Sequence, residues 1–106
     1  DVDPDSGLIL PESIEKFLDK EPKALIVNTS LGFVPDMEKI TQYEIPVIED
    51  ISQGFCSRYG EKYTGSFSEL CIISLDIENI ITAGQGGLLL TKNRKYLKNI
   101  KTHIGC

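Results

Sequence analysis

Short apolar runs without polar alternation constrain the fold of this chain more than any other feature. Ala24-Leu25-Ile26-Val27 is one such run, and three more follow it along the 106 residues. A strand with one face in water alternates apolar and polar residues, whereas a strand covered on both faces is apolar throughout. The runs therefore predict buried strands. We expect them near 24–29, 45–50, 70–75 and 87–92.

Helical patterns fill the intervals between most of these runs. Pro11 suits the first turn of a helix, and Ile14 and Phe17 form one apolar face. Pro35 opens a second helical segment. The last one predicts an amphipathic helix with a basic outer face and a buried inner face of Tyr96, Leu97, Ile100 and Ile104. We expect helices near 11–20, 35–43 and 93–103.

Strands that alternate with helices predict a single three-layer α/β domain with a mainly parallel sheet and right-handed crossovers. The turn Gly84-Gln85-Gly86-Gly87 is too short to hold a helix, so the last strand is expected to run antiparallel at an edge. We expect the four strands to lie in sequential order. The segment Arg58 to Ser66 resembles a small hairpin that turns at Gly60-Glu61.

Composition excludes some partners. The formal net charge of −5 argues against a nucleic acid or an anionic membrane surface, and no apolar run is long enough to span a bilayer. Cys56, Cys71 and Cys106 form no C-x-x-C pair, and His103 is the only histidine, which predicts ordinary thiols in the cytoplasm. The chain begins without Met in sequence that reads as structured, so we expect a piece of a longer protein.

Polar residues end three of the expected strands: Asn28-Thr29-Ser30, Glu49-Asp50 and Ser74. Ligands of open α/β sheets bind outside the carboxyl ends of the strands, so these residues are candidates for a binding site. Burial of an unpaired carboxylate would cost several kcal/mol, which makes the adjacent pair Glu49-Asp50 the most informative of the three. The alternative, solvated loop residues or helix caps, stays equally open on the pattern alone.

Several motifs in order then make the sequence specific. The chain contains DVDPDSG, GFVPDME, PVIEDISQ, YTGSFSE and TAGQGGLLLT, and it resembles the nucleotide-sugar aminotransferases over nearly its whole length. Members of this family are fold-type-I enzymes that use pyridoxal phosphate (PLP) to aminate keto-sugars for polysaccharides and deoxysugars. The resemblance implies that residues 1–106 form the middle portion of the large PLP-binding domain.

The resemblance also implies roles for three residues. Asp50 matches the aspartate that faces the pyridine nitrogen of PLP, and Gln53 matches the residue that packs on the ring near its 3-hydroxyl. Ser74 matches the serine that binds the cofactor phosphate. Glu49 would then be a neighbour with a structural role.

Other positions depart from the family pattern. Asn79 stands where the family places the lysine that binds PLP covalently, and it is also not the histidine of the related dehydratases. Thr29 replaces a common histidine, and Leu75-Asp76 replaces an aromatic-histidine pair. The carboxylate of Asp76 would repel a phosphate group nearby. The resemblance therefore implies weak or lost PLP binding and no catalysis by this chain alone.

Three functions stay open at this point. The first is a degenerate aminotransferase-like domain that acts in binding or as a scaffold, and the second is a fragment of an active sugar aminotransferase or dehydratase. The third is an unrelated α/β module that binds a phosphorylated ligand or a protein. Because a strand at 24–29 would expose an apolar edge, we expect either a homodimer or pairing with the remainder of a longer chain.

Overall fold

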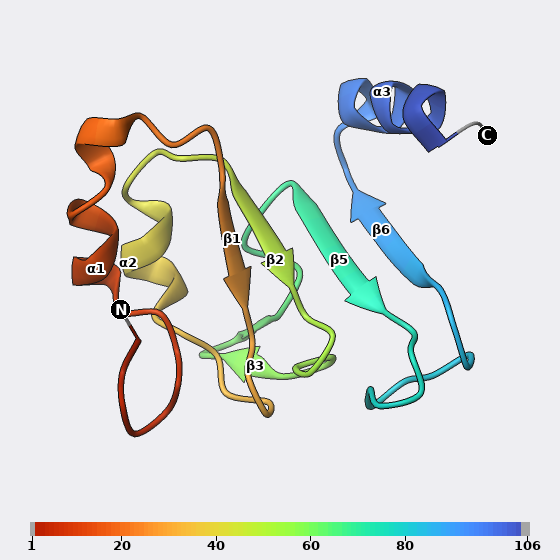
Figure 1. Ribbon diagram of the computed structural model, residues 1–106, viewed down its shortest axis with the longest axis horizontal. Coiled ribbons are helices and arrows are strands. Elements are labelled where there is room, and N and C mark those ends of the chain that lie inside the picture. The colour runs from red at the N-terminus through yellow and green to blue at the C-terminus, as the bar shows by residue number, and fades with distance from the viewer. Residues whose placement is uncertain (1, 105–106) are drawn as a thin grey trace.

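The computed structural model describes residues 2–104 and shows a sheet of four strands with short helices beside it (Figure 1). The sheet contains β1 (Leu25–Asn28), β2 (Val47–Asp50), β5 (Leu70–Ser74) and β6 (Gly87–Thr91). The helices are α1 (Pro11–Glu15), the 3₁₀ helix η1 (Leu18–Lys20), α2 (Met37–Thr41) and α3 (Arg94–Ile104). Strands β3 (Arg58–Tyr59) and β4 (Lys62–Tyr63) form a separate hairpin.

The sheet has the predicted order and directions. Its strands lie in the order β1-β2-β5-β6, with β1, β2 and β5 parallel and β6 antiparallel to β5. Two segments that contain helix or hairpin connect the parallel strands, while the loop at 75–86 reverses the chain before β6. The expected hairpin is also confirmed, since Tyr59 pairs with Lys62 on either side of Gly60-Glu61.

The first two helices are shorter than expected. Pro11 occupies the start of α1, but the segment continues only as the separate turn η1. Glu21 caps the C-terminal end of η1 in a left-handed conformation with φ 48°, and Pro22 directly after it cannot continue a helix. α2 begins two residues after Pro35, with the Asp36 carboxylate accepting a hydrogen bond from the Lys39 N–H.

Two buried clusters lie on one face of the sheet. The first joins Ile14 of α1 and Met37 and Ile40 of α2 to Val27 of β1. The second consists of Ile51, Cys71 and Ile73. Register places Val27, Glu49 and Cys71 side by side, so they share this face. Helices α1 and α2 therefore form one layer against it.

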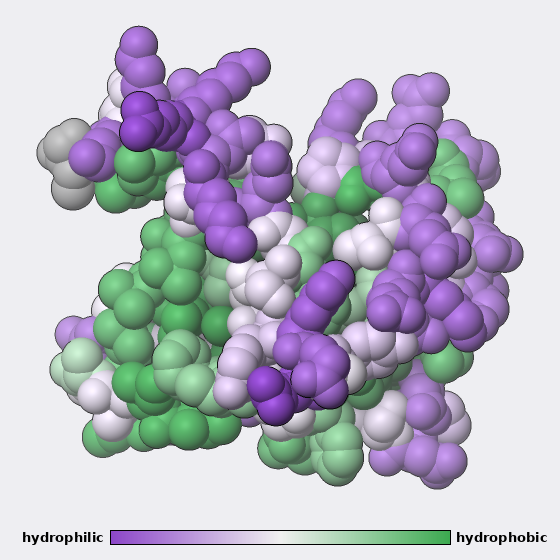
Figure 2. Space-filling model, turned by 180° about the vertical axis from the view of Figure 1, so that it is seen from behind, coloured by the Kyte–Doolittle hydropathy of each residue, from purple (hydrophilic) through white to green (hydrophobic). Residues whose placement is uncertain are grey.

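The other face is more open than the sequence predicted. Ile26 of β1 is 63% exposed, and Leu88, Leu89 and Leu90 of β6 are each nearly half exposed, so the expectation of burial on both faces is wrong for β1 and β6. Seen from behind, apolar surface gathers on the side of β6, below α3 (Figure 2). The strands are apolar as predicted, but too few of the described residues pack against this second face of the sheet to bury it.

The burial of helix α3 also differs from the prediction. It forms as predicted, but none of its residues is buried, and Leu97 and Ile104 are 44% and 64% exposed. The helix lies beyond the end of β6 (Figure 1), and Tyr96 alone lines a pocket with Ile48 and Leu70 of the sheet. The amphipathic pattern correctly predicted a helix, but such a pattern does not show whether another surface packs against the apolar face. No helix within residues 2–104 has the length and apolar character needed to cross a membrane.

Glu49 is a buried carboxylate that ties the loop after the hairpin to the sheet. Its side chain is 2% exposed and accepts hydrogen bonds from Gly65 N–H at 2.6 Å, Phe67 N–H at 2.9 Å and Ser68 N–H at 2.8 Å. The Ser68 hydroxyl lies 2.9 Å from Glu49 Oε1 and 2.7 Å from the Leu70 carbonyl oxygen, and its single hydrogen is donated to one of them at a time. Three backbone donors thus replace the water that this charge loses on burial. The structural role expected for Glu49 rests on these contacts.

Removal of this carboxylate should destabilise the fold strongly. We expect Glu49→Ala to lower the free energy of unfolding by about 2–4 kcal/mol, because several backbone N–H groups lose their acceptor at once. Glu69→Ala is the matched control: that side chain is exposed and, within residues 2–104, bonds only Asn93, so the loss should stay below about 0.5 kcal/mol. Urea unfolding followed by circular dichroism measures both, and equal losses would contradict the role given to Glu49.

Candidate functional site

The carboxyl ends of the parallel strands bring three polar side chains to one face of the sheet. Asn28 pairs in register with Asp50, which in turn pairs with Ile72. Side chains of paired residues share a face, and Ser74 lies two residues beyond Ile72 on that same face. Glu49 belongs to the opposite face. The structure therefore brings Asp50 and Ser74 together at one edge, as the sequence predicted.

The Asp50 carboxylate is held through one of its two oxygens. Its Oδ1 accepts a hydrogen bond from the Ser52 hydroxyl at 2.6 Å and another from the Ser52 N–H at 3.1 Å. Among residues 2–104 no donor reaches Oδ2. Half-buried Asp50 thus keeps one oxygen available for a cationic or hydrogen-bonding group of a ligand.

Gln53 lies beside the loop that follows β1. Its Oε1 accepts a hydrogen bond from the Leu31 N–H at 3.1 Å. Leu31 is 81% exposed and has φ 52°, a left-handed conformation that is uncommon for leucine. Because the amide oxygen is used inside the protein, the NH₂ group is left as the donor that Gln53 can offer to a ligand.

Gly54 lets the loop after β2 return against the end of β1. A Cβ atom at this position would lie 2.2 Å from Thr29 Oγ1 and 2.4 Å from Thr29 Cβ. Thr29 is itself buried, and its N–H and hydroxyl both donate to the Asp50 carbonyl oxygen, at 3.0 Å and 3.3 Å. This close approach is what places Gln53 within reach of Leu31.

The loop after β5 carries the positions that depart from the family pattern. The Asp76 N–H donates to Ser74 Oγ at 3.3 Å, and the Asn79 N–H donates to the Asp76 carbonyl at 3.1 Å. Asp76 is exposed and Asn79 is half-buried. Asp76 thus bonds Ser74, the residue expected to bind the phosphate, through its backbone N–H. The carboxylate of Asp76 is exposed.

Lys92 lies at the other end of β5 from the loop that holds Asn79, the position to which the resemblance assigns the PLP lysine. β6 runs antiparallel to β5, so Thr91 pairs with Leu70 at the amino end of β5, while Gly87 pairs with Ser74 at its carboxyl end. Lys92 follows Thr91 and therefore lies at the opposite end of the sheet from Ser74. The position of Lys92 follows from the antiparallel direction of β6, which the glycine turn predicts.

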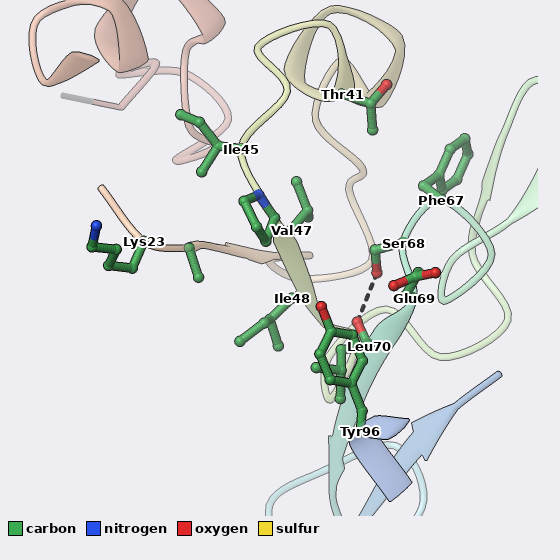
Figure 3. A pocket seen from close by; sticks show the side chains of 12 residues that line it. Lys23, Thr41, Ile45, Val47, Ile48, Phe67, Ser68, Glu69, Leu70 and Tyr96 are labelled. Carbon is green, nitrogen blue, oxygen red and sulfur yellow. Dashed lines mark hydrogen bonds between the residues drawn. The ribbon is translucent and has the colours of Figure 1, made fainter. Parts of the chain in front are cut away.

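One pocket lies at the amino end of the strands. It has a volume of about 640 Å³, and its lining includes Lys23, Thr41, Ile48, Leu70 and Tyr96 (Figure 3). A second pocket of about 470 Å³ lies beside β1, with Phe17 and Ile26 in its wall. Neither is lined by Asp50, Gln53 or Ser74. The candidate site is therefore the open surface at the carboxyl ends of the strands and not one of these pockets.

Cys71 is buried behind the site. Desolvation, with the negative charges of Glu49 and Asp50 nearby, raises the pKa of its thiol to about 11. The thiol stays protonated at neutral pH and packs as a small apolar group with Ile51 and Ile73. Cys56, by contrast, is exposed.

The DegT/DnrJ/EryC1/StrS aminotransferase family model matches residues 1–103. The chain belongs to this family. The resemblance read from the motifs is thereby confirmed, and the family is one of PLP-dependent enzymes.

Two curated relatives match most of this chain, an aminotransferase and a synthase. The chain is 30% identical over 95 residues to L-glutamine:2-deoxy-scyllo-inosose aminotransferase of Micromonospora echinospora, which covers 86% of this chain and 23% of the relative. It is 30% identical over 98 residues to GDP-perosamine synthase of Escherichia coli, covering 89% and 27%. The chain thus spans about a quarter of the length of these relatives.

Solved structures confirm the fold. The aminotransferase from Psychrobacter cryohalolentis matches with a TM-score of 0.82 at 30% identity, over 90% of this chain and 25% of that chain. 3-Amino-5-hydroxybenzoic acid synthase matches with a TM-score of 0.85 at 20% identity, over 95% and 28%. NtdA of Bacillus subtilis, solved with bound cofactor PMP, matches with a TM-score of 0.72 at 24% identity, over 88% and 22%.

The described residues fit the ring of PLP in part. Asp50 offers a free carboxylate oxygen and Gln53 a free amide donor, while the hydroxyl of Ser74 retains its own hydrogen to donate. When bound in such a site, PLP supplies an electron sink for amino-group transfer. No amine that could bind it covalently stands at position 79.

Sequence reasoning missed Ser52, Leu31 and Gly54. The spacing Asp-x-Ser is a signal for Ser52, because an aspartate often accepts the N–H two residues on. The return of the loop onto Thr29 has no comparable signal, since it depends on two segments 25 residues apart.

A side chain at Gly54 should disturb this site and the fold together. We expect Gly54→Ala to lower the free energy of unfolding by about 1–3 kcal/mol, because the new methyl group overlaps Thr29. The double variant Gly54→Ala/Thr29→Gly should lose less than the two single losses added together, since one substitution makes room for the other. Thermal and urea unfolding provide the values, and simple additivity would show that the overlap is not the cause.

Proposed function

We propose that this chain is the middle portion of the large, PLP-binding domain of a nucleotide-sugar aminotransferase-like protein. In this proposal Asp50, Gln53 and Ser74 contact PLP or PMP without a covalent bond, and residues 1–106 do not catalyse transamination by themselves. The proposal is supported by the family match and by the convergence of Asp50 and Ser74 at one edge of the sheet. The substrate class, by analogy with the relatives, is an amino sugar or its keto precursor.

The free oxygen of Asp50 is the observation that carries the proposal. A carboxylate opposite the pyridine nitrogen would hold that nitrogen protonated, and Oδ2 is the oxygen left for this contact. Gln53 would donate to the oxygen substituent of the ring, and Ser74 to the phosphate. Every residue then uses a group that the protein itself leaves available.

Asn79 is the reason to propose a degenerate, pseudoenzyme-like domain. An amide cannot form a covalent bond to the aldehyde of PLP, and Asp76 adds a negative charge near the phosphate ligand. The second candidate is a fragment of an active aminotransferase or dehydratase. The 30% identity to two named biosynthetic enzymes over about nine tenths of the chain favours that candidate.

The cofactor test uses borohydride, which converts a PLP–lysine linkage into a permanent adduct. We expect no specific lysine adduct in the wild type and, at most, weak non-covalent binding. Asn79→Lys should gain an adduct at position 79, because a tethered amine beside the aldehyde acts at high effective concentration. Mass spectrometry of peptides identifies the modified lysine.

Asn99→Lys is the matched control, since position 99 is an exposed position on α3. It should show no more adduct than the other surface lysines. A stoichiometric adduct at one lysine of the wild type would overturn the degenerate-domain proposal in favour of an active enzyme. If Asn79→Lys behaves like Asn99→Lys, the assignment of position 79 to the lysine site is wrong.

We also propose that the chain associates, either with a second copy or with the remainder of a longer chain, through the free edge of β1. Ile26 on this strand is 63% exposed and lies in the wall of the pocket beside it. An apolar, unpaired strand edge favours pairing with another chain. The cytoplasm is the proposed compartment, because the cysteine pattern does not indicate a disulfide framework.

Sedimentation velocity should show association that increases with concentration. Ile26→Lys should reduce it, because a charge on an edge strand opposes pairing. Leu31→Lys is the control, since Leu31 is exposed to a similar degree but lies in a loop. A clean monomer at the highest concentration would contradict the proposal, and equal effects of both lysines would show that the β1 edge is not the contact.

A further inference from the structure

The Ser52 side chain lies between the two residues proposed to contact the ring nitrogen and the phosphate of the cofactor. We propose that Ser52 is a positioning residue: it fixes the carboxylate of Asp50 and connects it to the strand end that carries Ser74. This inference rests on the proposed function, because it gives Ser52 a role toward the ligand that Asp50 would face.

The hydrogen bonds of Ser52 have a defined direction. The Ser74 N–H donates to Ser52 Oγ at 2.8 Å, and Ser52 Oγ lies 2.6 Å from Asp50 Oδ1. An amide nitrogen can only donate, and an ionised carboxylate can only accept. The single hydrogen of the Ser52 hydroxyl must therefore point to Asp50, so that a continuous chain of donors runs from Ser74 to Asp50.

Ser52 also decides which oxygen of Asp50 is left free. Its hydroxyl and its N–H both donate to Oδ1, the second at 3.1 Å. Two bonds to one oxygen, at least one of them short and charge-assisted, restrict rotation of the Asp50 side chain. Oδ2 then has a fixed position for the pyridine nitrogen. Without Ser52, either oxygen could turn toward the ligand.

The same hydroxyl extends the pairing of two strands beyond their backbone ladder. The Ile51 N–H donates to the Ile72 carbonyl at 3.0 Å, just after the last paired residues of β2 and β5. Farther along β5, the Ser74 N–H bonds Ser52 Oγ instead of a backbone carbonyl. Ser52 thus sets the separation between the ends of β2 and β5, and with it the spacing of Asp50 and Ser74.

The test is a double-mutant cycle on PLP binding, followed by fluorescence titration. We expect Ser52→Ala to raise the Kd about tenfold, the effect of losing a charge-assisted hydrogen bond that orients the carboxylate. In the Asp50→Asn background the same substitution should change the Kd less than about twofold, since the residue through which Ser52 acts is altered. Ser52→Thr, which keeps a hydroxyl, should restore most of the affinity. Ser57→Ala, a half-buried serine directly before β3, is the control without effect.

A second measurement needs no ligand. In the free protein, NMR couplings between Hα and the two Hβ atoms of Asp50 should report a single side-chain rotamer. In Ser52→Ala they should move to rotamer-averaged values, and exchange of the Ser74 amide with solvent should become about tenfold faster. Ser52→Thr and Ser57→Ala should resemble the wild type in both respects.

The outcomes separate this inference from the proposed function. An equal effect of Ser52→Ala on the Kd with and without Asp50→Asn would overturn the inference, because Ser52 would then only support the fold. If the wild type binds no PLP, or Asp50→Asn has no effect, the proposed function fails; the NMR couplings then decide whether Ser52 fixes Asp50. Couplings that stay unchanged in Ser52→Ala would overturn the inference in either case.

Discussion

Two adjacent carboxylates on opposite faces of the sheet, Glu49 and Asp50, organise this structure. Successive residues of a strand point to opposite faces, so Glu49 enters the side covered by the hairpin loop while Asp50 lies on the other side. Glu49 accepts hydrogen bonds from the N–H groups of Gly65, Phe67 and Ser68 and holds that loop against the sheet. The loop in turn covers Cys71, so the core behind the site depends on this one buried charge.

The other carboxylate is organised by local contacts and left partly unused. Asp50 gives one oxygen to Ser52, and Gln53 gives its amide oxygen to Leu31. What is left over is a carboxylate oxygen, an amide donor and the hydroxyl of Ser74. In the proposed function these three groups contact the ring nitrogen, a ring oxygen and the phosphate of PLP. Asn79 is the proposed reason why such contact would form no covalent bond in this chain.

Much of the fold and part of the site follow from the sequence. The apolar runs, the short glycine turn and the motif order predicted the four strands, their order, the antiparallel last strand and the family. They also pointed to Asp50, Gln53 and Ser74, whose roles stay predictions. Burial did not follow from the sequence, since α3 and both edge strands keep apolar side chains exposed. A pattern indicates which face is apolar but not whether a second surface covers it.

The sequence by itself determined the strand positions, the reversal before β6 and the absence of a lysine at position 79, since each depends on residue type and local spacing. Only the tertiary structure decided how the site is held. The Ser52 hydroxyl bonds two strand ends, Gln53 bonds a loop 22 residues away, and Gly54 packs directly against Thr29. Such contacts require segments distant in the chain to meet at a particular separation. Residue order alone does not specify that separation.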